Sequence, residues 1–294
     1  MIDIHCHLLP EVDDGPKSWD VAVEMCRMAA ADGITHAVAT PHANDRYAYD
    51  RAYLSGLLGE LREKSGSILQ LSLGCDFHLS FENLERVLEQ PHTYTIGETN
   101  YLLIELSNYS VPTQLGECFF RLGDRGLTPI LTHPERNPIL QQTPQRVLEW
   151  AEQGCLIQVT ASSLTGFWGE RPEIIAHWLL DRSAVHVLAS DAHDTKRRIP
   201  NLSAARAVAE KIAAKTAGEW RALFAGNDVC CCIMASVEEA MRDPHFLARG
   251  VFGARLAAGG NEMTALPVPI APQFRAQPDT AGYPALGEAN SLLK

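Results

Sequence analysis

The sequence has no long hydrophobic run, because no window approaches the roughly twenty apolar residues that a membrane-spanning helix needs. Its N-terminus lacks the charged and apolar regions of a signal peptide. The eight cysteines include no Cys-x-x-Cys pair, and three of them, at 230–232, are consecutive, which suits neither a disulfide framework nor a tetrahedral zinc site. We therefore expect a protein of the reducing cytoplasm that does not insert into a membrane.

An excess of positive charge is also missing. The chain has 25 Lys and Arg against 36 Asp and Glu, so its formal net charge is 25 − 36 = −11. Surfaces that bind nucleic acids are basic, and we expect no nucleic-acid partner. With 294 residues, of which 46% are hydrophobic, the chain can still bury one large core.

What the sequence does contain is a histidine pair close to its start, His5 and His7. Side chains two positions apart on a strand point to the same face, so both imidazoles can face one metal ion. Cys6 lies between them and is expected to pack on the opposite face. Two carboxylates follow: Asp14 is a candidate ligand, whereas Asp13 can be explained as the cap of a turn before Gly15.

Further apolar, β-branched-rich runs are predicted strands, and most of them carry or precede a residue that can bind a metal. The seven predicted strands are residues 2–7 with His5 and His7, 37–41 before His42, 71–75 before Asp76, 101–106 with Glu105, 128–132 before His133, 156–160, and 185–190 before Asp191 and His193. The run at 156–160 is the exception, because it is followed by Ala161, Ser162 and Ser163.

Helical patterns separate these runs, at residues 18–33, 50–64, 81–89, 113–125, 144–153 and 172–181. Alternating strands and helices indicate parallel strands with helical crossovers. Ligands at the ends of many successive strands favour a barrel with its site at that rim, because an open sheet concentrates its site at one switch point. We therefore predict an α/β fold, a (β/α) barrel of about seven units.

The candidate ligands are too many for one ion, since a single zinc needs about three or four. They suit two or three ions that share carboxylates, and nitrogen with oxygen ligands favours Mn²⁺, Fe or Zn²⁺. Clustered metal ions activate water and hold the oxygens of a phosphoryl or acyl centre. Phosphate esters are the better prediction, because Arg136, Arg197 and Arg198 lie near the expected rim and a guanidinium matches phosphate oxygens.

Several segments together carry a family resemblance. They are residues 3–7 (DIHCH), 12–17 (VDDGPK), 40–42 (TPH), 103–105 (LIE), 132–136 (THPER) and 189–193 (ASDAH). They resemble the polymerase-and-histidinol-phosphatase (PHP) superfamily and, more narrowly, the manganese-dependent tyrosine-protein phosphatases of bacterial capsule and exopolysaccharide operons. The resemblance covers roughly residues 1–213. It implies a distorted (β/α)₇ barrel, a three-metal centre, and a phosphotyrosine protein, in particular a tyrosine autokinase, as substrate.

The resemblance also implies which residues share each metal ion. His5, His7, Asp76 and Asp191 would hold one ion, Asp76, Glu105 and His133 a second, and Asp14, His42 and His193 a third. Arg136 and Arg198 would bind the phosphate. One departure is Asp76, because the family usually has a glutamate there and aspartate is shorter by one methylene.

The sequence lacks the Cys-x5-Arg loop of thiol-based tyrosine phosphatases, so the resemblance predicts hydrolysis without a cysteine nucleophile. Two alternatives stay open: a PHP phosphoesterase for a small metabolite such as histidinol phosphate, and a non-catalytic metal-binding module.

The last part of the chain has a different character. We place a domain boundary at 214/215, between a phosphatase barrel at residues 1–214 and an irregular appendage at 215–294. Residues 219–224 look helical, whereas Gly, Ala and Pro beyond residue 243 are typical of extended or poorly ordered chain. Segments between residues 215 and 287 resemble the C-terminal part of class III CoA transferases. The N-terminal half of those transferases, which carries their catalytic aspartate, has no counterpart in this resemblance, so no transferase activity is implied.

Overall fold

The structure is a computed structural model that describes residues 1–66 and 68–213, and the short stretches 241–242, 247, 255–258, 261–264 and 281–282. It divides into two compact units, Met1–Thr216 and Ala217–Lys294. The helix expected at residues 219–224 and the Pro-rich stretch lie outside the described residues.

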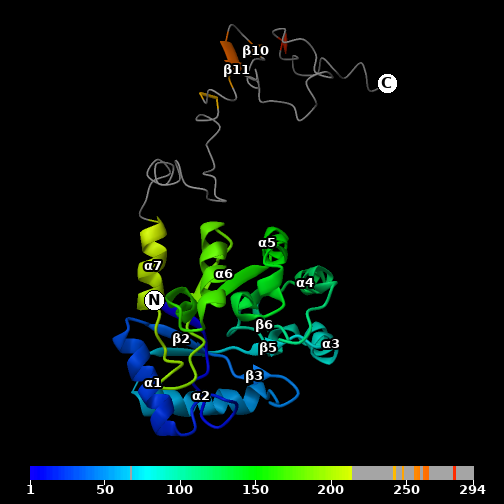
Figure 1. Ribbon diagram of the computed structural model, residues 1–294. Coiled ribbons are helices and arrows are strands. Elements are labelled where there is room, and N and C mark those ends of the chain that lie inside the picture. Colours follow the sequence, from blue (N-terminus) through cyan, green and yellow to red (C-terminus); the bar gives the residue numbers. More distant parts are fainter. Residues whose placement is uncertain are drawn as a thin grey trace. The chain divides into compact units, whose positions relative to one another are not determined.

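The first unit alternates strands and helices along the chain (Figure 1). Its strands are β1 (Ile2–Cys6), β2 (His36–Ala39), β3 (His42–Ala43), β4 (Gln70–Leu73), β5 (Asp76–His78), β6 (Tyr101–Glu105), β7 (Thr128–Thr132), β8 (Leu156–Thr160) and β9 (Val187–Ala189). Its helices are α1 (Trp19–Ala31), α2 (Arg51–Ser65), α3 (Phe81–Glu89), α4 (Leu115–Asp124), α5 (Gln145–Glu152), α6 (Glu170–Asp181) and α7 (Ser203–Ala213), with short 3₁₀ turns η1 (Pro91–Thr93), η2 (Pro134–Arg136), η3 (Leu140–Gln142) and η4 (Ala161–Thr165).

All neighbouring strands of this unit are parallel and form two sheets, ordered β1-β2-β4 and β3-β5-β6-β7-β8-β9. The strands expected at 37–41 and 71–75 therefore end early, at Ala39 and Leu73, and each is followed after a short break by a separate strand, β3 or β5. Backbone hydrogen bonds cross these breaks, from Gly74 N to Ala39 O (2.8 Å) and from Asp76 N to Pro41 O (3.2 Å). The α/β class with parallel strands is confirmed.

The first and last strands of the unit meet at a short contact, which we call the β1–β9 seam (residues 5–7 with 191–192). Cys6 and Ala192 form an isolated parallel bridge. His7 N donates to Ala192 O and Asp191 N donates to His5 O, each at 2.8 Å. The strands thus form two parallel sheets that meet at this seam through a few hydrogen bonds, so the expected barrel is distorted and not closed by a continuous ladder.

Helix boundaries follow local capping chemistry. The Ser18 hydroxyl accepts from Val21 N at the start of α1, and the Asp50 carboxylate accepts from two amides at the start of α2. Helix α2 ends at Gly66, whose φ of +66° lies in the left-handed region that glycine adopts without a Cβ penalty. Among the described helices, none combines the length and apolar character needed to cross a bilayer.

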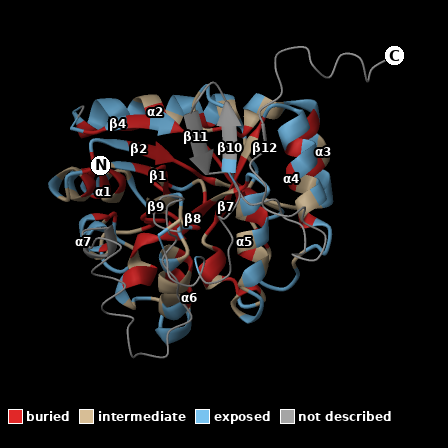
Figure 2. Cartoon of the chain, turned by 90° about the horizontal axis from the view of Figure 1, so that it is seen from above, coloured by how far each residue is buried: buried red, intermediate tan, exposed pale blue. Residues whose placement is uncertain are grey.

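Burial separates the inside of the first unit from its outside. In the view from above, buried strands occupy the centre, and the surrounding helices turn exposed faces outward (Figure 2). The apolar inner face of α1, for example, buries Ala22, Met25, Cys26 and Ala29. Burying each such side chain contributes roughly 25 cal/mol per Å² of apolar surface, which holds the strands and their C-terminal ends in place.

The second unit contains strands that the sequence did not predict. They are β10 (Arg255–Ala258), β11 (Asn261–Thr264) and β12 (Ala281–Gly282). Strand β10 pairs antiparallel with β11 and parallel with β12.

Candidate active site

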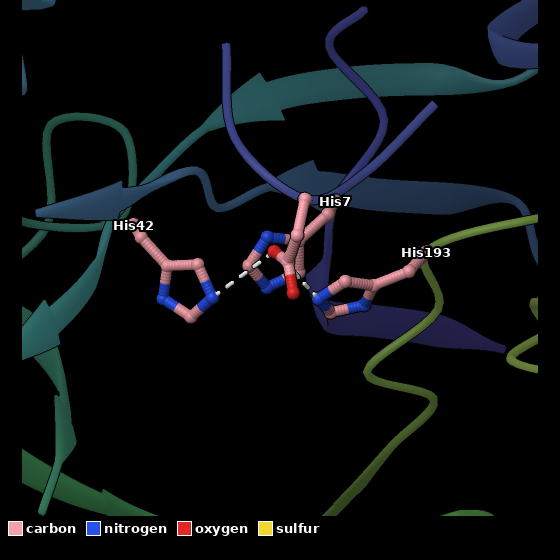
Figure 3. Close-up of side chains that lie close together, drawn as sticks. His7, His42 and His193 are labelled. Carbon is pink, nitrogen blue, oxygen red and sulfur yellow. Dashed lines mark ion pairs between the residues drawn. The ribbon is translucent and has the colours of Figure 1, made fainter. Parts of the chain in front are cut away.

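Residues at the C-terminal ends of the strands meet around a group of four side chains. His7 from the end of β1 and His42 at the start of β3 have ring centroids 4.6 Å apart, and those of His7 and His193 are 3.8 Å apart. The side chains of His42 and His193 converge on one carboxylate, since each Nε2 lies 3.3 Å from Asp14 Oδ1 (Figure 3). One ligand atom from each of the four residues lies within 4.8 Å of the others, close enough to share a metal ion.

Asp76 belongs to both of the other groups that could hold an ion. Its Oδ2 lies 3.5 Å from His5 Nε2 and 3.1 Å from His42 Nδ1. The first group joins Asp76 to His5 and His7, and the second joins it to His42 and Glu105. Aspartate therefore reaches far enough from β5 to belong to two groups, although it is one methylene shorter than the glutamate that the resembled family usually has there.

The buried polar atoms of this cluster fit metal ligands. In the described part of the chain, no hydrogen bond is made by His5 Nε2, His7 Nε2, His42 Nδ1, His193 Nε2 or either Asp76 carboxylate oxygen. Burying polar atoms without partners costs free energy, and a cation among them would remove that cost. Nitrogen and carboxylate oxygen without thiolate suit Mn²⁺, Fe or Zn²⁺.

Negative charge outweighs burial at two of the imidazoles, whereas burial prevails at His7 and lowers its pKa to about 4. Burial lowers the pKa of His5, but Asp76 and Asp191 outweigh burial and raise it to about 9. Burial likewise lowers the pKa of His42, and Asp14 with Asp76 raises it to about 12. Burial would raise the pKa of Asp76, but His5 and His42 hold it well below its usual range. Without metal, these imidazoles carry the positive charge that a cation would otherwise supply.

Two ligands are oriented by a second hydrogen bond. His7 Nδ1 lies 2.7 Å from Asp13 Oδ2, and Asp13 also accepts from the amides of Gly15 (2.8 Å) and His42 (3.2 Å). His5 Nδ1 lies 2.9 Å from Gln158 Oε1. In both residues Nε2 is left free to face a metal, which is the usual arrangement of histidine ligands.

Asp191 stands between the cluster and two arginines. Its Oδ1 lies 3.5 Å from His5 Nε2 and 3.6 Å from His7 Nε2. Its Oδ2 accepts from Arg136 and, at 2.6 Å, from Arg198. Asp191 adopts a left-handed φ of +51°, which asparagine and aspartate tolerate better than other residues with a Cβ.

Trp168 packs against both arginines. The guanidinium carbon of Arg136 lies 3.9 Å from its ring centroid, and that of Arg198 lies 5.4 Å away. Cation–π contacts of this kind attract a guanidinium to the face of the aromatic ring. Arg198 Nε is buried without an acceptor in the described residues, so it can still donate to an anion.

The groups agree only in part with the assignment by resemblance. Asp14, His42 and His193 lie together as that assignment has them, and His7 joins them. His42 also lies with Asp76 and Glu105, and neither His133 nor Asp191 belongs to any of the three groups found among the described residues. His133 is packed beside His5, with ring centroids 5.7 Å apart, and has a left-handed φ of +35°. How the ligands are shared among the ions stays a prediction.

Sequence reasoning missed several residues of the site. Gln158 lies on β8, the predicted strand to which no metal ligand was assigned. The signal that could have found it is a polar amide within an otherwise apolar run. His78 follows Asp76 by two positions, the same spacing as His5 and His7, and its Nδ1 lies 3.4 Å from Glu105 Oε2. Trp168 lies between helices and had no signal in the sequence.

The five cysteines within residues 1–66 and 68–213 do not offer a nucleophile. Burial raises the pKa of Cys6 and Cys75 well above the usual range, and that of Cys26 and Cys155 to about 12. The pKa of Cys118 is raised by burial as well. None of these described thiols is therefore activated as a thiolate, which is the reactive form.

Two family models match the chain. One, described as "Capsular polysaccharide synthesis, CpsB/CapC", matches residues 1–230. The other, "CoA-transferase family III", matches residues 178–290, so that it begins earlier than the tail resemblance near residue 215.

Individual relatives agree with the first family. Tyrosine-protein phosphatase YwqE of Bacillus subtilis is 32% identical over 215 residues, which are 72% of this chain and 84% of YwqE. Tyrosine-protein phosphatase CpsB of Streptococcus pneumoniae is 30% identical over 237 residues, 77% of this chain and 96% of CpsB.

The fold matches a solved structure of the same kind. It comes from the crystal structures of YwqE and of CpsB from Streptococcus pneumoniae, described as unique metal-dependent tyrosine phosphatases. The TM-score is 0.67 with 32% identity, over 72% of this chain and 87% of the other. The family expected from the sequence motifs is confirmed, and the chain belongs to the CpsB/CapC family of capsular polysaccharide synthesis.

Proposed function

We propose that this chain is a metal-dependent tyrosine-protein phosphatase of capsule or exopolysaccharide synthesis. The observation that carries the proposal is the position of Asp191, which faces the histidine cluster through Oδ1 and both Arg136 and Arg198 through Oδ2. A phosphate held by these arginines would lie directly beside the ligand cluster. The names of the relatives support phosphotyrosine as the substrate.

The metal ligands in this proposal are His5, His7, Asp14, His42, Asp76, Glu105, His133, Asp191 and His193. They would hold two or three ions, Mn²⁺ by preference, with Fe or Zn²⁺ as alternatives. When bound, the ions supply Lewis-acid chemistry, which polarises phosphoryl oxygens and activates water.

The protein's own groups bind and orient the substrate. Arg136 and Arg198 donate to phosphate oxygens, and each guanidinium has further N–H groups beyond the one directed at Asp191. Asp13 and Gln158 keep His7 and His5 in one orientation. No thiol takes part.

The substrate we propose is a tyrosine-phosphorylated protein, in particular a tyrosine autokinase of the same polysaccharide system. The capsular family description and the relatives' names support this choice. A cytoplasmic location is part of the proposal, since the described cysteines are free thiols, as in a reducing compartment.

The test compares a phosphotyrosine peptide with histidinol phosphate, using protein stripped by chelator and reloaded with Mn²⁺, Fe²⁺ or Zn²⁺ singly. We expect hydrolysis of the peptide only with metal, best with Mn²⁺, and no loss after thiol alkylation. A higher rate on histidinol phosphate would instead favour a metabolite phosphoesterase.

The variant Asp191→Ala is the matched control for metal binding. If the wild-type protein binds its full complement of metal but hydrolyses no phosphoester, a non-catalytic binding module is favoured. Activity that survives chelation and is abolished by alkylation would contradict the metal mechanism.

A further inference from the structure

A pocket of about 310 Å³ opens beside Asp191 and Arg198, and the chemistry proposed above does not account for it. Its walls are η4, the aromatic pair Phe167 and Trp168, the segment 196–199 and the start of α7. Of the candidate metal ligands it contains only Asp191. A phosphate at Arg136 and Arg198 would therefore leave the rest of the substrate free to extend into this pocket.

The pocket carries positive charge that the protein does not use internally. Lys196 and Arg197 are exposed, and within residues 1–66 and 68–213 neither side chain forms an ion pair or a hydrogen bond. The acidic groups nearby are already engaged. Asp191 is bound by Arg136 and Arg198, while Asp194 Oδ1 accepts from the backbone amides of Lys196 and Arg197, each at 2.6 Å. The side chains of Lys196 and Arg197 therefore form a positively charged site on a chain whose net charge is −11.

Apolar surface lies next to these cations. Phe167 is 44% exposed and packs edge-on against Trp168, with centroids 5.2 Å apart. Ile199, which also lines the pocket, is 38% exposed. Ligand pockets span roughly 300–1,000 Å³, so this one has room for one or two side chains of an extended peptide.

We propose, on the basis of the proposed phosphatase function, that this pocket binds the residues flanking the phosphotyrosine and selects acidic ones. Carboxylates on either side of the phosphotyrosine would pair with Lys196 and Arg197, and the adjoining chain would pack on Phe167. The preferred substrate class is then an acidic phosphotyrosine peptide, and Lys196, Arg197 and Phe167 determine specificity without contacting the phosphate held by Arg198.

The test uses three substrates with the metal-loaded enzyme. Two are phosphotyrosine peptides of equal length, one with Asp and Glu beside the phosphotyrosine and the other with Asn and Gln at the same positions. The third, p-nitrophenyl phosphate, has no flanking residues and reports whether the metal site is intact. We expect kcat/KM to be about three- to ten-fold higher for the acidic peptide, as expected for two partly exposed ion pairs.

The decisive variant is Lys196→Glu with Arg197→Glu, in which that ratio should fall to one or below. The control is Lys64→Glu with Arg125→Glu, which makes the same change in net charge. These two lie at the C-terminal ends of α2 and α4, at the opposite end of the strands from the site, and should keep the wild-type ratio.

The outcomes separate the two proposals. Hydrolysis of p-nitrophenyl phosphate with equal rates on both peptides would overturn this inference alone, as would a preference that survives the double variant. Loss of the ratio in the control variant would show an effect of net charge and not of the pocket. No hydrolysis of any of the three substrates would overturn the proposed function and this inference together.

Discussion

Asp13 shows at the scale of a single residue how a turn residue can act on a metal site. Its carboxylate accepts from His7 Nδ1 and from two backbone amides, so it fixes both the imidazole and the loop before α1. Gly15 is part of this arrangement, because a Cβ there would lie 2.9 Å from Asp13 Oδ1 and 3.0 Å from His7 Cβ. The loop therefore accepts only glycine without moving Asp13.

Replacing Asp13 with asparagine should weaken metal binding roughly 10- to 100-fold, as is typical when the partner of a histidine ligand is changed. The amide cannot accept all the hydrogen bonds that the carboxylate accepts, so His7 loses its fixed orientation. Mn²⁺ titration of activity measures the effect, with the exposed Asp20→Asn as control. An unchanged Mn²⁺ requirement would show that Asp13 only shapes the turn.

Metal binding should release protons, because the metal-free cluster holds charged imidazoles. The pKa of His5 is about 9 and that of His42 about 12, so both are protonated at about pH 7, and a coordinating nitrogen must lose its proton. Apparent Mn²⁺ affinity should therefore rise as pH increases from about 6 to 9. Calorimetry in two buffers of different ionisation enthalpy counts the protons, and an affinity independent of pH would contradict the expectation.

The helix α7 depends on a residue far away in the sequence. The Asp32 carboxylate, at the end of α1, accepts from Asn201 Nδ2 (2.7 Å), from the amides of Leu202 (2.7 Å) and Ser203 (3.0 Å), and from the Ser203 hydroxyl. These bonds cap the start of α7 and attach it to α1. They also hold one wall of the pocket that contains Phe167.

Removing this cap with Asp32→Ala should destabilise the protein by about 1 kcal/mol, because partly buried donors at the start of α7 lose their acceptor. Thermal unfolding measures the loss. The control is Asp181→Ala, at the exposed end of α6, where the described residues show no such bonds. An equal change in melting temperature for both variants would refute a specific role of Asp32.

Elements with a local signal in the sequence could be predicted, and elements that depend on distant contacts could not. Strands and helices with a clear apolar period, such as β7 and α3, match their predicted ranges closely. The α7 helix was missed because its cap comes from Asp32, more than 160 residues earlier. The short strands β3 and β5 were missed as well, because two or three residues show no period.

Candidate ligands could be predicted because the C-terminal ends of parallel strands meet at one rim of a barrel. A residue that directly follows a predicted strand is therefore expected near the residues that follow the other strands. The partners of these ligands could not, since Gln158 meets His5 only after β8 has been placed in the sheet.

At the scale of the whole molecule, the ligand cluster spans the β1–β9 seam. His5 and His7 come from the first strand, and Asp191 and His193 follow the last strand of the ring. A metal ion held by these residues would link the two ends of the first unit, whose backbone contact at the seam is short. Binding to the folded state alone stabilises it by about 2.7 kcal/mol at a ligand concentration of 100 Kd.

Chelation should therefore lower the melting temperature and loosen the seam before the rest of the barrel. Hydrogen exchange should quicken at the amides of His7 and Asp191, while those of β7 remain protected. Adding Mn²⁺ back should restore both. Uniform faster exchange, or no change in melting temperature, would count against a metal link across the seam.

The seam also determines when during synthesis the protein can become active. The ligands of β1 leave the ribosome before the others, but they meet their partners only after Asp191, His193 and Arg198 have emerged. Every shorter nascent chain carries the histidine pair without the groups that complete the site. With the proposed site, phosphate release would begin only after the segment that follows β9 has been translated, and shorter nascent chains would be inactive.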